Sequence, residues 1–167
     1  MQQQLMCLTF PPHLLYDLGL DAADKFTRAI MPGSSLWLVP PEDSELYKTV
    51  HDLIINQFPS VYPIAIPPHF APHITLTSGI NERDAESSDP QKWLDGITFP
   101  DLKDLKVAIQ DVEVGSVFFK KVTMKCEKTA DLSELAATCR AAGVEGLGKH
   151  AADRWVEESY LPHCSLM

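Results

Sequence analysis

A five-residue pattern occurs twice in the chain and constrains the fold more than any other feature. The segment 72–76 reads Pro-His-Ile-Thr-Leu, and the segment 162–166 reads Pro-His-Cys-Ser-Leu. Side chains of an extended strand point alternately to its two faces. Each copy therefore predicts a strand that carries an imidazole and a hydroxyl on one face and has an apolar back that can pack on a core.

The residue types on the polar face suit chemistry on a phosphate diester. His73 and Thr75 come from the first copy, and His163 and Ser165 come from the second. Imidazole both accepts and donates protons near neutrality, because its free pKa is about 6.5. Each hydroxyl can donate a hydrogen bond to a phosphoryl oxygen. Two such strands facing each other would surround an anion, and each acid or base role contributes on the order of 10²–10⁴ in rate.

Size and charge restrict the class of partner. A chain of 167 residues can form one compact domain or two small lobes with a shared core. Its apolar fraction of 45% is that of a globular protein. The formal net charge of −9 argues against stable binding of a nucleic-acid polymer, which relies on many Lys and Arg contacts. A small anionic ligand remains compatible with this composition.

The cysteines and the hydropathy pattern bear on the compartment. Cys7, Cys126, Cys139 and Cys164 form no C-x-x-C pair, so neither a zinc knuckle nor a disulfide framework is predicted. Reduced thiols indicate a cytoplasmic or nuclear protein. The N-terminus has no basic start followed by an apolar run, and no apolar stretch of 18 residues occurs. We therefore expect neither secretion nor a membrane span.

The first half of the chain divides near residue 34. Residues 1–33 show no strand-like alternation, and we interpret them as an extension outside the catalytic unit. The apolar run 36–39, closed by two prolines, predicts a buried strand. A helix should begin at Asp43 or Ser44 and bury one stripe of side chains. That stripe comprises Leu46, Val50, Leu53 and Ile54.

The second half predicts a hairpin and two helices. Segments 107–114 and 117–126 are interpreted as strands joined at Gly115 and Ser116. On the second strand, Lys121, Thr123, Lys125 and Glu127 would form a solvated face. A helix should follow from Thr129 or Asp131 to Gly143. The glycines after it lack the Ser/Thr of a P-loop, so we expect a connector, and helical character resumes over 151–158.

Together these segments resemble a known family. Either motif alone is better explained by an ordinary histidine at a strand end, but two copies in register are more specific. Paired His-x-Thr/Ser motifs are typical of the 2H phosphoesterases. The chain is most similar to the fungal and plant 2′,3′-cyclic nucleotide phosphodiesterases. The resemblance runs roughly over 35–166, through Leu-Trp-Leu at 36–38, Phe-Lys-Lys-Val at 119–122 and Trp-Val-Glu-Glu at 155–158.

The resemblance implies a fold and a site. The fold would be α+β, with two lobes of antiparallel sheet related by pseudo-twofold symmetry and the motif strands facing across a cleft. The domain would span 34–167, with the second lobe incomplete because relatives continue beyond the second motif. His163 would be the base and His73 the acid, while the hydroxyls of Thr75 and Ser165 would bind phosphate oxygens. Tyr160 and Lys120 are further candidate substrate contacts, but a core position for Tyr160 and a solvated strand face for Lys120 are the more ordinary alternatives. No metal or other cofactor is expected.

The resemblance also implies an activity. We expect a cytoplasmic monomer that hydrolyses 2′,3′-cyclic nucleotides or ADP-ribose 1″,2″-cyclic phosphate, by-products of tRNA splicing. Some relatives are nuclear or Golgi-associated. One alternative is a 2′-5′ RNA ligase-like or RNA-end phosphodiesterase, which should show a more basic groove. Another is a catalytically impaired domain that binds nucleotides or partners, because the chain stops just after the second motif.

Overall fold

The structure of the chain is a computed structural model. It describes residues 4–8, 34–62, 70–80, 90–103, 105–115, 121–144 and 148–167. Lys120, most of 1–33 and Ser116 of the predicted hairpin turn lie outside these described residues.

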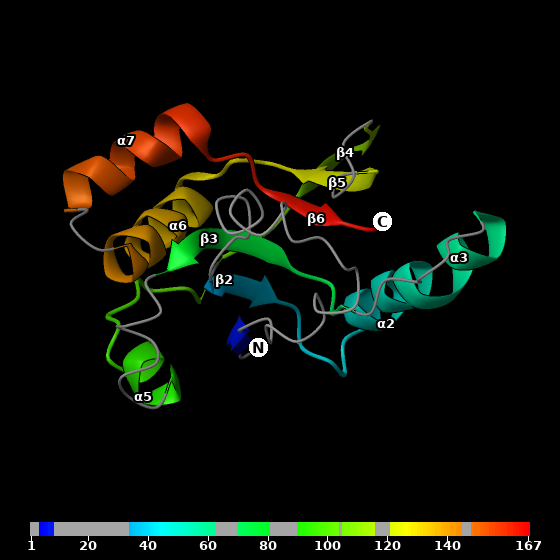
Figure 1. Cartoon of the computed structure of the whole chain (residues 1–167), viewed down its shortest axis with the longest axis horizontal. Coiled ribbons are helices and arrows are strands. Elements are labelled where there is room, and N and C mark those ends of the chain that lie inside the picture. The colour runs from blue at the N-terminus through cyan, green and yellow to red at the C-terminus, as the bar shows by residue number, and fades with distance from the viewer. Residues whose placement is uncertain are drawn as a thin grey trace, which may run out of the picture.

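Six strands form one antiparallel sheet in the order β1-β2-β3-β6-β5-β4. The strands are β1 Gln4–Leu8, β2 Ser34–Val39, β3 Ile74–Ile80, β4 Ile109–Val114, β5 Val122–Cys126 and β6 His163–Ser165. Both predicted motif strands are present, as the beginning of β3 and the whole of β6, and they lie side by side at the centre of the sheet (Figure 1). The predicted α+β class is confirmed. The two motif strands, expected to face each other across a cleft, are instead neighbours in a single sheet.

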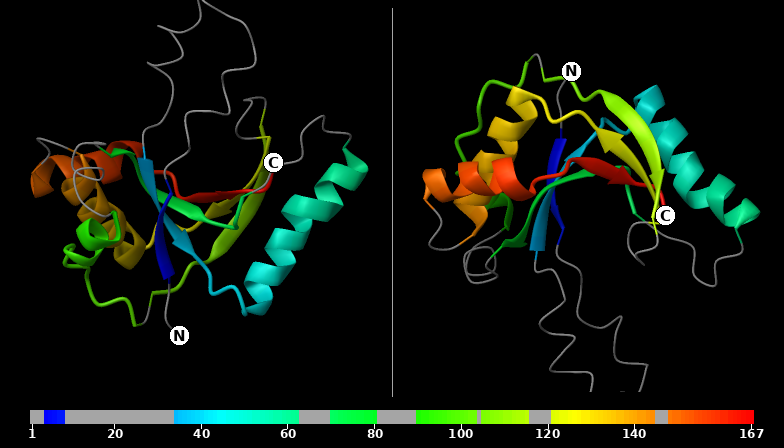
Figure 2. Two further views of the ribbon diagram at one scale, coloured as in Figure 1. Left: turned by 60° about the horizontal axis from the view of Figure 1, so that its bottom comes forward. Right: turned by 90° about the horizontal axis from the view of Figure 1, so that it is seen from above.

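The helices repeat one order of elements around the two motif strands. β2 leads through α2 Glu45–Asp52, the π-helical turn η2 Leu53–Gln57 and α3 Phe58–Val61 to β3. β5 leads through α6 Ala130–Gly143 and α7 Lys149–Ser159 to β6, and α5 Pro90–Asp95 lies between the halves in sequence. Figure 2 shows the curled sheet with α6 and α7 on one side and α2 and α3 on the other. This strand–helices–motif-strand repeat is consistent with the pseudo-symmetry that the resemblance implies.

Local signals place the helix ends correctly. Ser44 caps α2, because its Oγ accepts a hydrogen bond from the Tyr47 backbone N–H at 3.1 Å. Thr129 caps α6 in the same way through the Leu132 N–H at 3.3 Å. One residue of the predicted stripe is wrong: Leu46 is 53% exposed, whereas Val50 and Ile54 are buried. The first turn of α2 therefore lies beyond the edge of the core.

The core covers the backs of the motif strands. Ile74 and Leu76 from β3 pack with Cys164 and Leu166 in one buried cluster that includes the apolar residues of α6. This confirms the predicted apolar back of each copy. The described cysteines, Cys126, Cys139 and Cys164, are free and buried. None of the helices in the described part of the chain is long and apolar enough to cross a membrane.

The leading segment contributes a strand that the sequence does not reveal. β1 pairs antiparallel with β2 over five residue pairs, from Gln4 opposite Val39 to Leu8 opposite Ser35. The sequence alone indicates an extension without strand-like alternation over residues 1–33, whereas this part of them is a strand of the sheet. The sequence of β1, Gln-Leu-Met-Cys-Leu, lacks polar–apolar alternation. Its strand conformation comes with backbone pairing to a distant segment, which short-range patterns do not encode.

The predicted hairpin is present as β4 and β5. β4 begins two residues later than the sequence indicates, and residues 117–120 of the predicted second strand lie outside the described part of the chain. β4 is the edge strand and is exposed along its whole length. Val122, Met124 and Cys126 of β5 are buried. Thr123, expected on a solvated face, is only 7% exposed.

Candidate active site

Sheet register brings the four motif residues onto one face. β3 and β6 pair antiparallel with Ile74 opposite Cys164. This register sets His73 opposite Ser165 and Thr75 opposite His163. Residues directly opposite each other have Cβ atoms about 4.5–5.5 Å apart and point to the same face. The two imidazoles and two hydroxyls therefore form a quadrilateral, with each imidazole beside the hydroxyl of the other copy.

Each imidazole is held by a hydrogen bond of the same kind, from Nδ1 to the carbonyl oxygen two residues earlier. His73 Nδ1 lies 2.7 Å from the Ala71 carbonyl oxygen. His163 Nδ1 lies 2.8 Å from the Leu161 carbonyl oxygen. Because a carbonyl oxygen only accepts, Nδ1 must donate and carry the proton in each ring. The neutral ring then presents an unprotonated Nε2 that can act as a base, and the charged ring presents an Nε2–H that can act as an acid.

The proline of each motif explains this shared geometry. Pro72 and Pro162 separate each histidine from the carbonyl that holds it, and both prolines are buried. Proline fixes its own φ near −65° and has no N–H to compete for an acceptor. It also restricts the preceding residue to extended conformations. The chain therefore delivers the carbonyl of residue 71 or 161 to the imidazole two residues later.

His73 lies among aromatic rings. The Trp37 ring stacks on its imidazole, with centroids 3.6 Å apart and planes 10° apart. The Phe70 ring meets it edge-on at 5.7 Å. Burial lowers the pKa of His73, the Ala71 carbonyl partly offsets this, and the charge of His163 lowers the pKa further. Burial therefore favours the neutral form of His73, whereas its expected role as the acid uses the protonated form.

The second copy has polar neighbours that the sequence analysis did not assign to the site. In the β5–β6 register, Lys125 is opposite His163 and Thr123 is opposite Ser165. Both residues therefore share the face of the four motif residues. Lys125 Nζ also forms an ion pair with Glu113 Oε1 of β4 at 3.4 Å. The alternation of β5 showed that Thr123 and Lys125 share a face, but no local signal showed that this face continues into the motif face.

Neither of the two further candidate contacts is supported. Tyr160 is 4% exposed, belongs to the core cluster and lies beside Trp155, with ring centroids 5.4 Å apart. Burial raises the pKa of its hydroxyl. A side chain in this position packs the core, so Tyr160 is corrected to a structural residue. Lys120 lies outside the described residues.

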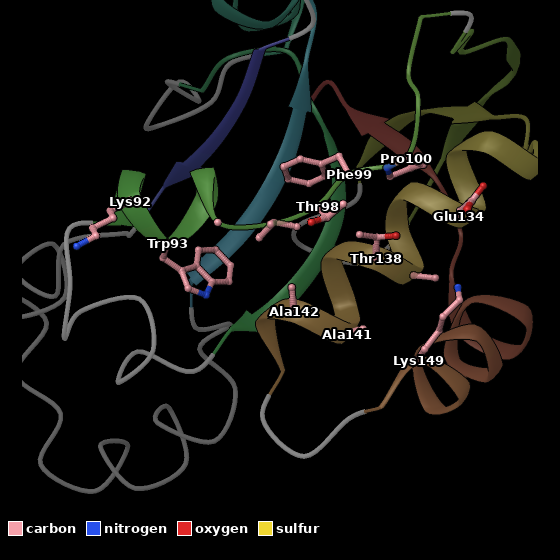
Figure 3. Close-up of a pocket in the computed structure, with 13 residues that line it drawn as sticks. Lys92, Trp93, Thr98, Phe99, Pro100, Glu134, Thr138, Ala141, Ala142 and Lys149 are labelled. Atoms are coloured by element: carbon pink, nitrogen blue, oxygen red, sulfur yellow. The ribbon is translucent and has the colours of Figure 1, made fainter.

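A hollow in the described structure lies away from the histidines. It has a volume of about 830 Å³ and is lined by α5, the segment 96–100, α6 and the start of α7. Figure 3 shows Trp93, Phe99 and Thr138 around it. None of the four motif residues lines this hollow. Within the described ranges, no group of three or more His, Cys, Asp or Glu side chains could hold a metal ion.

Comparison with known proteins places the chain in a family. The family described as cyclic phosphodiesterase-like protein matches residues 31–167, and the chain belongs to that family. Three fungal relatives each carry the name 2′,3′-cyclic-nucleotide 3′-phosphodiesterase. The Phaeosphaeria nodorum protein is 40% identical over 138 residues, which are 82% of this chain and 69% of the relative.

The other two relatives are more distant. The Neurospora crassa protein is 34% identical over 151 residues, covering 82% of this chain and 71% of its own. The Saccharomyces cerevisiae protein is 28% identical over 154 residues, covering 80% and 63%. The similarity therefore extends over most of this chain and over about two thirds of each relative.

Proposed function

We propose that this chain is a cyclic phosphodiesterase that hydrolyses 2′,3′-cyclic nucleotides to nucleoside 2′-phosphates. The observation that carries the proposal is the β3–β6 register, which sets two imidazoles and two hydroxyls on one face. The matching Nδ1 hydrogen bonds support it, because they leave both Nε2 atoms to handle protons. The names of the three relatives support the substrate class.

Hydrolysis of the cyclic phosphate needs one group that accepts a proton and another that donates one. An Nε2 atom acting as a base takes a proton from water while the water oxygen bonds to phosphorus. The bond from phosphorus to O3′ breaks, and the departing oxygen takes the proton from the other Nε2. Thr75 and Ser165 donate hydrogen bonds to the non-bridging oxygens, where negative charge grows in the transition state.

We assign the base role to His73 and the acid role to His163, the reverse of the expectation from the resemblance. A base must be unprotonated at the working pH. The aromatic surroundings of His73 and the lowered pKa that follows from its burial both support this state. The deprotonated His73 and protonated His163 are regenerated by exchange with solvent after each turnover.

The finer substrate choice is also a proposal. We infer that ADP-ribose 1″,2″-cyclic phosphate, a by-product of tRNA splicing, is a second substrate, because the chain resembles enzymes that act on it. We further propose that the reaction requires no metal, since the four motif residues account for the acid, the base and the oxyanion contacts. An RNA-end phosphodiesterase is less well supported by a formal net charge of −9.

The test is turnover of a 2′,3′-cyclic mononucleotide by the purified chain, with and without EDTA. We expect turnover that survives EDTA and falls by at least about 10²-fold in both His73→Ala and His163→Ala. His150→Ala is the matched control, because His150 is an exposed histidine on α7 and should keep full activity. Binding without hydrolysis would indicate a nucleotide-binding domain. Preference for oligonucleotide ends would indicate the RNA-processing alternative.

A further inference from the structure

The two halves of the site differ outside the four motif residues. Trp37 and Phe70 surround the histidine of the first copy with aromatic rings. Beside the second copy, β5 supplies Thr123 next to Ser165 and Lys125 next to His163. One half of the site is therefore apolar at its margin, and the other half is polar and carries a cation.

Lys125 has carboxylates on its β4 side and an imidazole on its β6 side. On its outer side, β4 places Asp111 directly opposite it and Glu113 within 3.4 Å of its ammonium group. On its inner side, β6 places His163, with no carboxylate between them. The Lys125 and Glu113 side chains are 50% and 57% exposed. Because so exposed an ion pair is only weakly stabilising, the ammonium group can exchange Glu113 for an anion of the substrate.

Lys125 lies on β5, one strand further out than the strands β3 and β6 that carry the four motif residues. Neighbouring strands lie about 4.8 Å apart, so β5 is about 7 Å from the line midway between β3 and β6. The reacting phosphate must lie near that line, because two imidazoles and two hydroxyls surround it. The lysine is therefore displaced sideways from the reacting phosphate, toward whatever part of the substrate extends over β5.

We propose that Lys125 binds a second phosphoryl group of the substrate, one that does not react. The substrate class is a cyclic phosphodiester that also carries a phosphate on the far side of its ribose, such as a nucleoside 2′,3′-cyclic phosphate with a 5′-phosphate. The furanose ring and C5′ separate the two phosphates, which matches the sideways displacement of Lys125. This proposal rests on the proposed function and names the residue that would select among its substrates.

The test compares kcat/KM for adenosine 2′,3′-cyclic phosphate with kcat/KM for the same molecule bearing a 5′-phosphate. We expect the wild-type chain to prefer the 5′-phosphorylated substrate. Lys125→Gln should reduce that preference about three- to tenfold, as expected for one charged contact at a half-exposed position. Lys125→Arg should retain it. Raising the salt concentration should weaken the wild-type preference.

Lys103→Gln is the matched control. Lys103 is also an exposed lysine in an ion pair, with Asp101 at 3.3 Å, but it lies in a connecting segment outside the sheet. It should not change the preference. Circular dichroism and the thermal midpoint should show that every variant is folded.

The two proposals fail in different ways. If the wild-type chain hydrolyses neither substrate, the proposed function is overturned, and the second phosphate site with it. If it hydrolyses both but Lys125→Gln lowers both rates equally, Lys125 acts on the reacting phosphate and the second site is overturned. An unchanged preference in Lys125→Gln overturns it as well, while leaving the proposed function in place.

Discussion

The proline of the second motif offers a direct test of how the site is built. Pro162 separates His163 from the Leu161 carbonyl that accepts its Nδ1–H at 2.8 Å. Its own carbonyl accepts the Cys126 backbone N–H at 3.0 Å. Pro162→Ala retains that carbonyl, so the pairing of β5 with β6 should survive. The substitution removes only the ring that restricts residues 161 and 162.

The size of the effect follows from that one hydrogen bond. A neutral hydrogen bond of ordinary length contributes about 0.5–1.5 kcal/mol net. Loss of the Nδ1 bond should therefore shift the ratio of the two neutral His163 tautomers about two- to tenfold toward Nε2–H. As the proposed acid, His163 carries protons on both nitrogens, so the rate depends on this bond through the orientation of the Nε2–H that the bond holds. We therefore expect kcat/KM to fall by up to the same factor. Stability should fall by about 0.4–1 kcal/mol, because the unfolded chain gains freedom.

Nitrogen NMR of the imidazole rings measures the tautomers, and steady-state kinetics measures the rate. Pro100→Ala is the matched control, since Pro100 lines the hollow away from the histidines, and it should leave both readouts unchanged. A Pro162→Ala chain with an intact Nδ1–H tautomer and full activity would refute the idea that the proline sets the geometry. So would a loss of activity without any change in tautomer.

Three further predictions concern His73 and the packing behind it. Because the pKa of His73 is lowered in the folded chain, the unfolded chain binds more protons at this residue than the folded chain does below pH 6.5. The free energy of unfolding should therefore fall as the pH falls, by up to about 1.4 kcal/mol per pH unit relative to His73→Gln. Urea titrations at several pH values measure this difference. Trp37→Leu should expose His73 and move the acidic limb of the pH–rate profile to higher pH. Trp37→Phe keeps an aromatic ring and should move that limb less. Identical profiles would contradict the role given to the stacked ring. Gly143→Ala would bring a Cβ within 2.9 Å of Ile80 Cγ1 and should cost about 1–3 kcal/mol of stability. Combining it with Ile80→Ala should cost less than the sum of the two single changes, and strict additivity would show that the contact relaxes freely.

The four candidate site residues could be found in the sequence because their signals are local. Alternation within each motif shows that His73 and Thr75 share a face, since a strand has a period of two residues. The helix caps at Ser44 and Thr129 could be predicted for the same reason, because a cap depends on residues within one turn. The hairpin of β4 and β5 also joins neighbouring segments of the chain.

What the sequence left undetermined depends on pairing between distant segments. β1 is a strand only as a partner of β2, and its own residues carry no pattern. Lys125 and Thr123 join the motif face only through the register of β5 with β6, which a shift of one residue would reverse. The burial of His73 under Trp37, and of Tyr160 in the core, likewise depends on contacts across the sheet and between helices. Local patterns thus determine which side chains share a face of one strand, whereas strand register and burial determine which faces meet and how strongly each group holds its proton.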